Sequence, residues 1–302
     1  MPNSVFDRAA EDVGNIVGFG HVNVRVPDQR LATLFYIMGI GLTRDPYLVV
    51  GIDNMWVNVG DCQFHLPTGP AQVLRGTTGL VVPDLDALRL RLGVVAPRLA
   101  GTRFTWTDAG DAIDLTCPWG NQLRAHPPQP RFGRITLGMP YVELDAPPDS
   151  AEAIARFYRE TLHGLATTGE DAQGRFARVT AGPAAAILFR ETDRKLAEYD
   201  GSHIQISLAD FSGPHRRLLA RGLVTEESSQ HQYRFQDVVD PDSGDVLVTI
   251  EHEARSMRHP MHARALINRN AGQNNNRYAP GHEAWVPAMP PEDMERSRSS
   301  FV

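Results

Sequence analysis

The sequence predicts an α+β protein made of four βαβββ units that are paired into two domains. Three observations carry this prediction: a strand-and-helix motif that recurs four times, polar residues that cap the helices, and short alternating strands after each helix. The glycines that open the motif are spaced by 56, 62 and 63 residues; they are Gly20, Gly76, Gly138 and Gly201. A repeat at nearly constant spacing indicates that each unit buries its apolar face against a neighbouring unit.

The first two copies show the motif most clearly. A β-branched strand follows Gly20, and a helix is expected over residues 29–38, capped by Asp28. Apolar residues recur in this helix at intervals of three and four, which places them on one buried face. The second copy repeats the pattern, with a helix over residues 85–92 behind Asp84.

The third and fourth copies carry different helix starts. Asp149 with Glu152 three residues later is typical of a capping box, and it predicts a helix over residues 150–162. The fourth helix is expected to begin near Ser212, because Pro214 is tolerated in a first turn. Short alternating strands after each helix complete the four units.

The units predict two domains and an arm. The first domain is expected over residues 15–127 and the second over residues 134–255, joined by a Pro- and Arg-rich linker. From residue 256 to residue 302 the composition shifts to Asn, Pro, Arg and Ser, which favours an extended arm over the surface.

Composition narrows the function classes. The net charge of −6 argues against nucleic acid as a partner, because phosphate binding needs a basic surface. Two cysteines, Cys62 and Cys117, exclude a disulfide framework and a thiolate zinc site. The sequence has no apolar signal segment and no run of membrane length, so we expect a cytoplasmic protein that acts on a small molecule. Whether the chain forms a homo-oligomer is left open.

At the level of motifs, the chain resembles the vicinal-oxygen-chelate superfamily, the glyoxalase and extradiol-dioxygenase group. The likeness rests on Gly20-His21 followed by Val26-Pro27-Asp28, on Phe35-Tyr36, on 39–42 (Gly-Ile-Gly-Leu), and on the closing turn 118–121 (Pro-Trp-Gly-Asn). It covers residues 15–255, and four units in one chain are most similar to the two-domain type I extradiol dioxygenases. It implies an oxidoreductase that uses a divalent metal on a small aromatic or enolisable substrate.

In this fold each domain is expected to form a curved sheet with helices outside and a ligand cup inside, and alternation assigns the faces. Valines on the first strand must pack under the helix, so the residues between them face the first cup. The residues expected in the first cup are His21, Asn23, Arg25, Gln63, His65, Gln122, Arg124 and His126, with Thr77 in the second unit's equivalent of the His21 position. Those expected in the second cup are Met139, Tyr141, Glu143, Arg190, His203, Gln205, Ser207, Thr249, Glu251 and Glu253.

The resemblance implies a metal site in the second cup. Type I extradiol enzymes hold ferrous iron with two histidines and a carboxylate. The matching positions here are Met139, His203 and Glu251, and because a thioether is a poor ligand, His203 and Glu251 are the expected metal ligands. Iron(II) is the expected ion, with manganese(II), zinc(II) or no metal as alternatives. Arg190 stands near the family's acid–base position and would orient a substrate anion.

Further candidates complete the predicted site. Tyr141 is a candidate catalytic hydrogen-bond donor. Substrate-binding roles are predicted for Arg124, Met139, Gln205 and Tyr233. In the first cup His21 occupies a metal position and His65 lies near the acid–base position, so both are candidate catalytic residues. His21, His65 and His126 could also converge on one ion.

Two other functions remain open from sequence. The chain could be a metal-free member of the group, either a small-molecule binding protein or a cofactor-independent lyase or isomerase using His21, His65 and Arg124. It could also be an assembly component whose arm carries the function.

Overall fold

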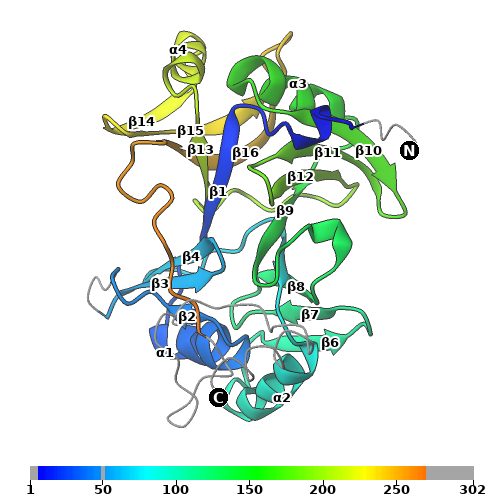
Figure 1. The fold of residues 1–302 in the computed structure, drawn as a ribbon, viewed down its shortest axis with the longest axis vertical. Coiled ribbons are helices and arrows are strands. Elements are labelled where there is room, and N and C mark those ends of the chain that lie inside the picture. The colour runs from blue at the N-terminus through cyan, green and yellow to red at the C-terminus, as the bar shows by residue number, and fades with distance from the viewer. Residues whose placement is uncertain (1–5, 49–51, 270–302) are drawn as a thin grey trace, which may run out of the picture.

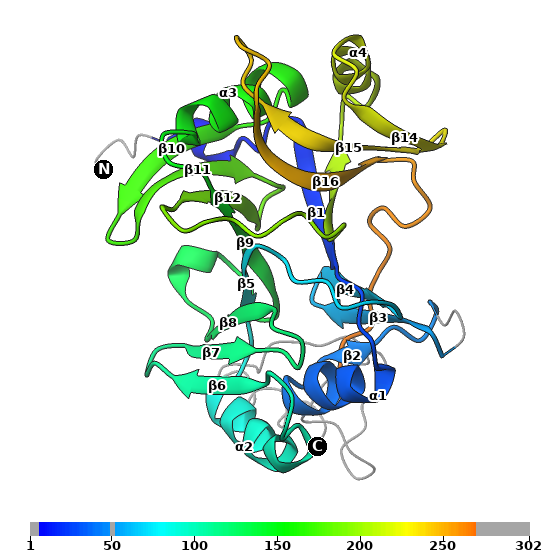
Figure 2. The same cartoon turned by 180° about the vertical axis from the view of Figure 1, so that it is seen from behind.

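The structure is a computed structural model that describes residues 6–48 and 52–269. Most of the predicted arm, residues 270–302, lies outside the described residues. Sixteen strands within the described part of the chain form two eight-stranded sheets, and helices cover their outer faces (Figures 1 and 2). The predicted α+β class with paired βαβββ units is confirmed.

The first sheet has the strand order β14-β15-β16-β13-β1-β4-β3-β2. Its strands from the first unit are β1 (Ile16–Asn23), β2 (Thr43–Arg44), β3 (Asn54–Val59) and β4 (Cys62–Pro67). Its strands from the fourth unit are β13 (His203–Leu208), β14 (Val224–Ser229), β15 (Gln232–Val239) and β16 (Val246–Ser256).

The second sheet has the order β10-β11-β12-β9-β5-β8-β7-β6. Its strands from the second unit are β5 (Gly76–Val81), β6 (Thr105–Asp108), β7 (Ile113–Thr116) and β8 (Gln122–His126). Its strands from the third unit are β9 (Gly138–Ala146), β10 (Ala166–Asp171), β11 (Gly174–Thr180) and β12 (Ala186–Glu191).

Each unit contributes one main helix. These are α1 (Gln29–Ala32), which continues as a π-type helix over Thr33–Gly39, then α2 (Leu85–Val95), α3 (Ala151–Leu162) and α4 (Ser212–Ala220). Short 3-10 segments occur at Ala9–Glu11, Ala96–Arg98 and Pro130–Phe132. Across residues 6–48 and 52–269, no helix combines the length and apolar character needed to span a bilayer.

The helix starts confirm two of the predicted caps and correct a third. Asp28 accepts hydrogen bonds from the first turn of α1, and Asp84 accepts one from Ala87 N. The predicted capping box at Asp149 is wrong, because Asp149 adopts a positive φ of 60° and does not cap α3. Instead the Glu191 carboxylate at the end of β12 accepts a hydrogen bond from Ala151 N at 2.9 Å. A neighbouring strand therefore supplies an acceptor for one amide of the first turn of this helix.

The predicted pairing of units is also wrong. The opening strands β1 and β13 pair antiparallel, and so do β5 and β9, so the first unit shares a sheet with the fourth and the second with the third. The predicted linker after residue 127 therefore connects two strands of the second sheet, β8 and β9, and does not join two domains. The third and fourth units meet on the helix side of the sheets instead: the ring of Phe157 on α3 lies 6.2 Å from the ring of Phe235 on β15. All four opening strands carry similar apolar patterns, so the pattern alone does not select their partners.

The close approach of β5 to β9 gives a stability prediction at Gly76. This residue has φ of +148°, and a Cβ there would lie 1.9 Å from the backbone oxygen of Glu143. Gly76→Ala is therefore expected to lower the free energy of unfolding by about 2–4 kcal/mol. Gly93→Ala is the matched control, because Gly93 lies within α2 with nothing within 4 Å of its Cβ position. That variant should gain up to about 1 kcal/mol. Urea denaturation checks both, and equal effects would contradict the packing.

Candidate metal centre

The candidate site lies on one face of the first sheet, where β1 pairs with β4 on one side and with β13 on the other. Strand register places the polar residues in two rows that cross the sheet from the first unit to the fourth. One row is His65, Asn23, His203 and Glu251, and the next is Gln63, His21, Gln205 and Glu253. The residues between them, such as Val22 and Ile204, are buried in the core.

Three histidines of these rows converge. One ring nitrogen from each of His21, His65 and His203 lies within 4.8 Å of the other two. The Nε2 atoms of His21 and His203 are 3.5 Å apart. That is long for a hydrogen bond and close to the separation of two nitrogens that each lie about 2.1 Å from one tetrahedral ion. The Nε2 atom of His65 is buried and has no hydrogen-bond partner among the described residues. A buried, unpartnered ring nitrogen on a histidine that converges with two others fits a metal ion.

The surroundings hold these imidazoles neutral. Burial, followed by the charge of Arg255, lowers the pKa of His21 well below its usual value and that of His65 to about 3. Burial, followed by the charge of Arg234, lowers the pKa of His203 to about 2. Neutral imidazole is the form that binds metal, so the histidines are ready to act as ligands at neutral pH.

Behind His203 lies a buried cluster of two glutamates and two arginines. Arg234 forms ion pairs with Glu251 and, at 2.6 Å, with Glu253. Arg255 reaches the other oxygen of Glu253, also at 2.6 Å. Glu251 Oε1 lies 3.4 Å from His203 Nδ1, on the side of the ring away from His21. A carboxylate at that nitrogen orients the ring and directs its other nitrogen toward the centre.

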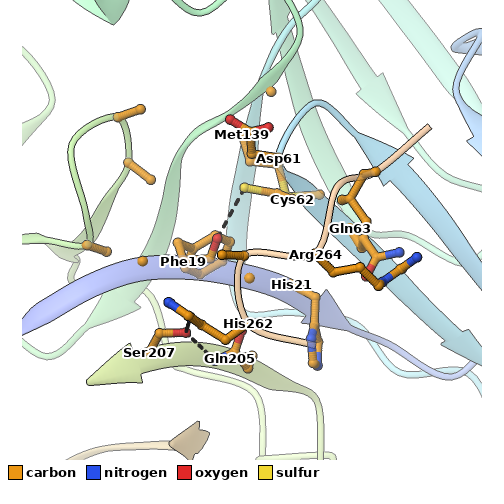
Figure 3. Close-up of a pocket in the computed structure, with 18 of the residues that line it drawn as sticks. Phe19, His21, Asp61, Cys62, Gln63, Met139, Gln205, Ser207, His262 and Arg264 are labelled. Carbon is orange, nitrogen blue, oxygen red and sulfur yellow. Dashed lines mark hydrogen bonds between the residues drawn. The ribbon is translucent and has the colours of Figure 1, made fainter. Parts of the chain in front are cut away.

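A cavity of about 490 Å³ begins at His21 and extends between the two sheets (Figure 3). At its polar end Gln205 lies across Gly20 so closely that a Cβ on Gly20 would be 1.7 Å from Gln205 Oε1. The absent side chain at residue 20 therefore lets the amide lie beside His21. The rest of the wall is mostly apolar or small, and it includes Phe19, Leu137, Met139, Ala181, Ala184 and Leu266.

Comparison with known protein families and with curated proteins finds no match. Solved structures do match. A Bacillus subtilis protein described as a presumed dioxygenase is 15% identical, with 95% of this chain and 96% of that chain covered and a TM-score of 0.53. Glyoxalase I from Zea mays is 12% identical, with 79% and 92% covered and a TM-score of 0.53. The chain has the vicinal-oxygen-chelate fold. Identities this low show the fold alone.

Within the vicinal-oxygen-chelate fold, the structure brings together residues that the sequence assigned to two separate cups. His21 and His65 of the first unit meet His203, Gln205 and Glu251 of the fourth on one sheet. In the metal site predicted near His203, Met139 occupied the position where the family has its first histidine ligand. The first unit supplies that histidine across the β1–β13 pairing.

Three predicted site residues lie on the other sheet, away from His203. Arg124 on β8 pairs with Asp114 at 3.1 Å. Tyr141 on β9 packs over Gly79 and bonds to His126 at 2.9 Å. These partners place Arg124, Tyr141 and His126 outside the histidine centre, so the expected convergence of His126 with His21 is wrong.

Arg190, Met139 and Tyr233 also differ from expectation. Arg190 on β12 forms ion pairs with Glu143 and Asp171 within the second sheet. Met139 lines the cavity, but it does so from the second sheet. Tyr233 is buried on the helix side, where its ring lies 4.9 Å from that of Phe211. The predicted role of Tyr233 in substrate binding is therefore wrong.

Sequence reasoning missed Arg234 and Arg255 as members of the site. Tyr233 and Phe235 are the core residues of β15, so strict alternation would have placed Arg234 on the polar face, directly opposite Glu253. Arg255 continues the face of Glu251 and Glu253 by the same rule. Neither signal could show that these arginines would pair with the glutamates beside His203.

Proposed function

We propose that this protein is a divalent-metal-dependent enzyme of the vicinal-oxygen-chelate type, acting on a small substrate with two adjacent oxygens, such as a catechol or an enediol. The observation that carries the proposal is the convergence of three ring nitrogens, one from each of His21, His65 and His203. In addition, the Nε2 atom of His65 is buried and has no hydrogen-bond partner among the described residues. His21, His65 and His203 would hold the ion, and Glu251 would orient His203.

The set of ligand atoms favours some metal ions over others. Three imidazoles suit iron(II) and zinc(II) better than manganese(II), which prefers oxygen ligands. When bound, the ion would act as a Lewis acid toward the two substrate oxygens, or as an oxygen-activating centre if it is iron. We propose iron(II) first, in keeping with an extradiol-like oxidoreductase.

The surrounding residues would bind and orient an anionic substrate. Two glutamates and two arginines compensate one another, and the three histidines are neutral, so the protein side of the centre carries no net charge. A divalent cation there would attract a substrate anion. Gln205 Oε1, held beside His21, could accept a hydrogen bond from a substrate hydroxyl. The apolar walls would exclude water from the reacting oxygens.

Metal analysis tests the proposal. The purified chain, stripped with a chelator and reconstituted anaerobically with iron(II), zinc(II) or manganese(II), is expected to retain a stoichiometric amount of iron or zinc after desalting. Bound metal should also raise the melting temperature, and the rise should grow with the logarithm of the ratio of free metal to the dissociation constant. If no ion is retained and no stabilisation is seen, the metal-enzyme proposal fails. The metal-free binding protein or lyase would then be the better reading.

A further inference from the structure

The segment that follows β16, residues 257–269, runs from the fourth unit down to the first (Figures 1 and 2). We call it the strap. It is attached at both ends: His262 lies 3.3 Å from Ser207 Oγ of the fourth unit, and Asn58 donates to the Ile267 oxygen at 2.7 Å. Asn268 also exchanges two hydrogen bonds with the backbone of Gly60. The strap thus crosses the polar face of the first sheet.

The strongest attachment is an ion pair between Arg264 and Asp45. Arg264 Nη2 lies 2.6 Å from Asp45 Oδ2, and Asp45 is completely buried. Asp45 also accepts hydrogen bonds from Gln63 and from two backbone amides. A buried carboxylate is costly without a cationic partner. The first unit therefore has a buried carboxylate whose charge is balanced by Arg264 of the strap.

The strap also forms one wall of the cavity. His262 and Arg264 point toward Gln205 and Gln63 across the opening (Figure 3). Met261 and Leu266 add apolar surface opposite the second sheet. The remaining volume of about 490 Å³ exceeds what a lone dihydroxybenzene ring fills, and most of the residues that line it are apolar or small. The space fits a ring that carries an apolar group.

We propose that the strap determines specificity: held by the Arg264–Asp45 pair, it forms the cavity wall that carries Met261 and Leu266, and it selects substrates that bear an aromatic or aliphatic group beside their two oxygens. The inference rests on the proposed function for the identity of the oxygen-binding end. The apolar selection itself depends only on the strap and the cavity.

The test compares two probes, catechol and 3-phenylcatechol, by anaerobic calorimetry on the metal-loaded chain. Arg264→Met should weaken binding of 3-phenylcatechol about tenfold, the loss expected for roughly two buried methylene groups, and change catechol binding less than about twofold. Proteinase K should also cleave the strap faster. Arg258→Met is the matched control, because Arg258 is an exposed arginine on the same segment.

A second variant guards against an indirect effect. Asp45→Asn should reproduce the change, and the double variant should be no worse than either single one, since both remove the same contact. Unchanged probe selectivity in Arg264→Met and Asp45→Asn, or equal weakening of both catechols, would overturn the inference. If the wild type retains no metal, the proposed function fails separately. The strap is then judged on the metal-free chain by the affinity ratio of biphenyl to phenol, and an unchanged ratio overturns it.

Discussion

Replacing any one of His21, His65 or His203 by alanine is expected to weaken the affinity for the reconstituted divalent ion by more than about a hundredfold. Each histidine contributes one of three ring nitrogens that lie within 4.8 Å of one another. Removing one leaves two ligands, too few for stable binding in a buried centre. Metal content after desalting and metal titration by calorimetry measure the loss.

The matched control is His215→Ala, because His215 pairs with Glu227 on the outside of the molecule, at α4. It should keep full metal content, and circular dichroism should show that all variants fold. Glu251→Gln separates two roles for that carboxylate. A weakening of about 10- to 100-fold fits the orientation of His203, whereas a loss as complete as that in His203→Ala indicates direct coordination. If only His203→Ala loses metal, the three-histidine centre is wrong.

Arg234→Met is expected to lower the free energy of unfolding by about 3–5 kcal/mol, which is the largest stability change predicted for this protein. The arginine is shared by Glu251 and Glu253, and all three side chains are largely buried. Among the described residues, its removal leaves Glu251 without an arginine or lysine partner and Glu253 with Arg255 alone, and burial already raises the pKa of Glu253. The urea midpoint at neutral pH measures the change.

The control for this prediction is Arg124→Met on the second sheet. Arg124 also pairs with a carboxylate, but both side chains are more than a third exposed, so the expected loss is at most about 1 kcal/mol. Losses of equal size would mean that the cluster behind His203 is not held as the structure indicates. A loss that disappears when Glu251→Gln is added would support the shared ion pair.

Much of the architecture could be predicted from the chain alone. The helix caps at Asp28 and Asp84, and the alternation of β1, β4, β13 and β16, specify local structure through neighbouring residues. The same alternation correctly placed His21, His65, His203 and Glu251 on polar faces. Tyr233 was predicted to bind substrate, but it lies with Phe235 on the core face of β15.

The assembly of the site could not be predicted in this way. Each strand pattern states which side chains face the core, but four opening strands with similar patterns can pair in more than one combination. The prediction paired neighbours in sequence, and it therefore split the histidines between two cups. The same error brought Arg124, Tyr141 and Arg190 into the predicted chemistry, although each has a partner within the second sheet.

The sequence by itself determined four βαβββ units, the helix caps at Asp28 and Asp84 and the polar faces of β1, β4, β13 and β16, because these depend on contacts between residues close in the chain. The tertiary structure alone decided that β1 pairs with β13, that His21 and His65 meet His203, and that Arg264 of the strap reaches Asp45. Those contacts join residues as many as 219 positions apart. They are selected by the packing of whole units and the burial of charge, which no local pattern encodes.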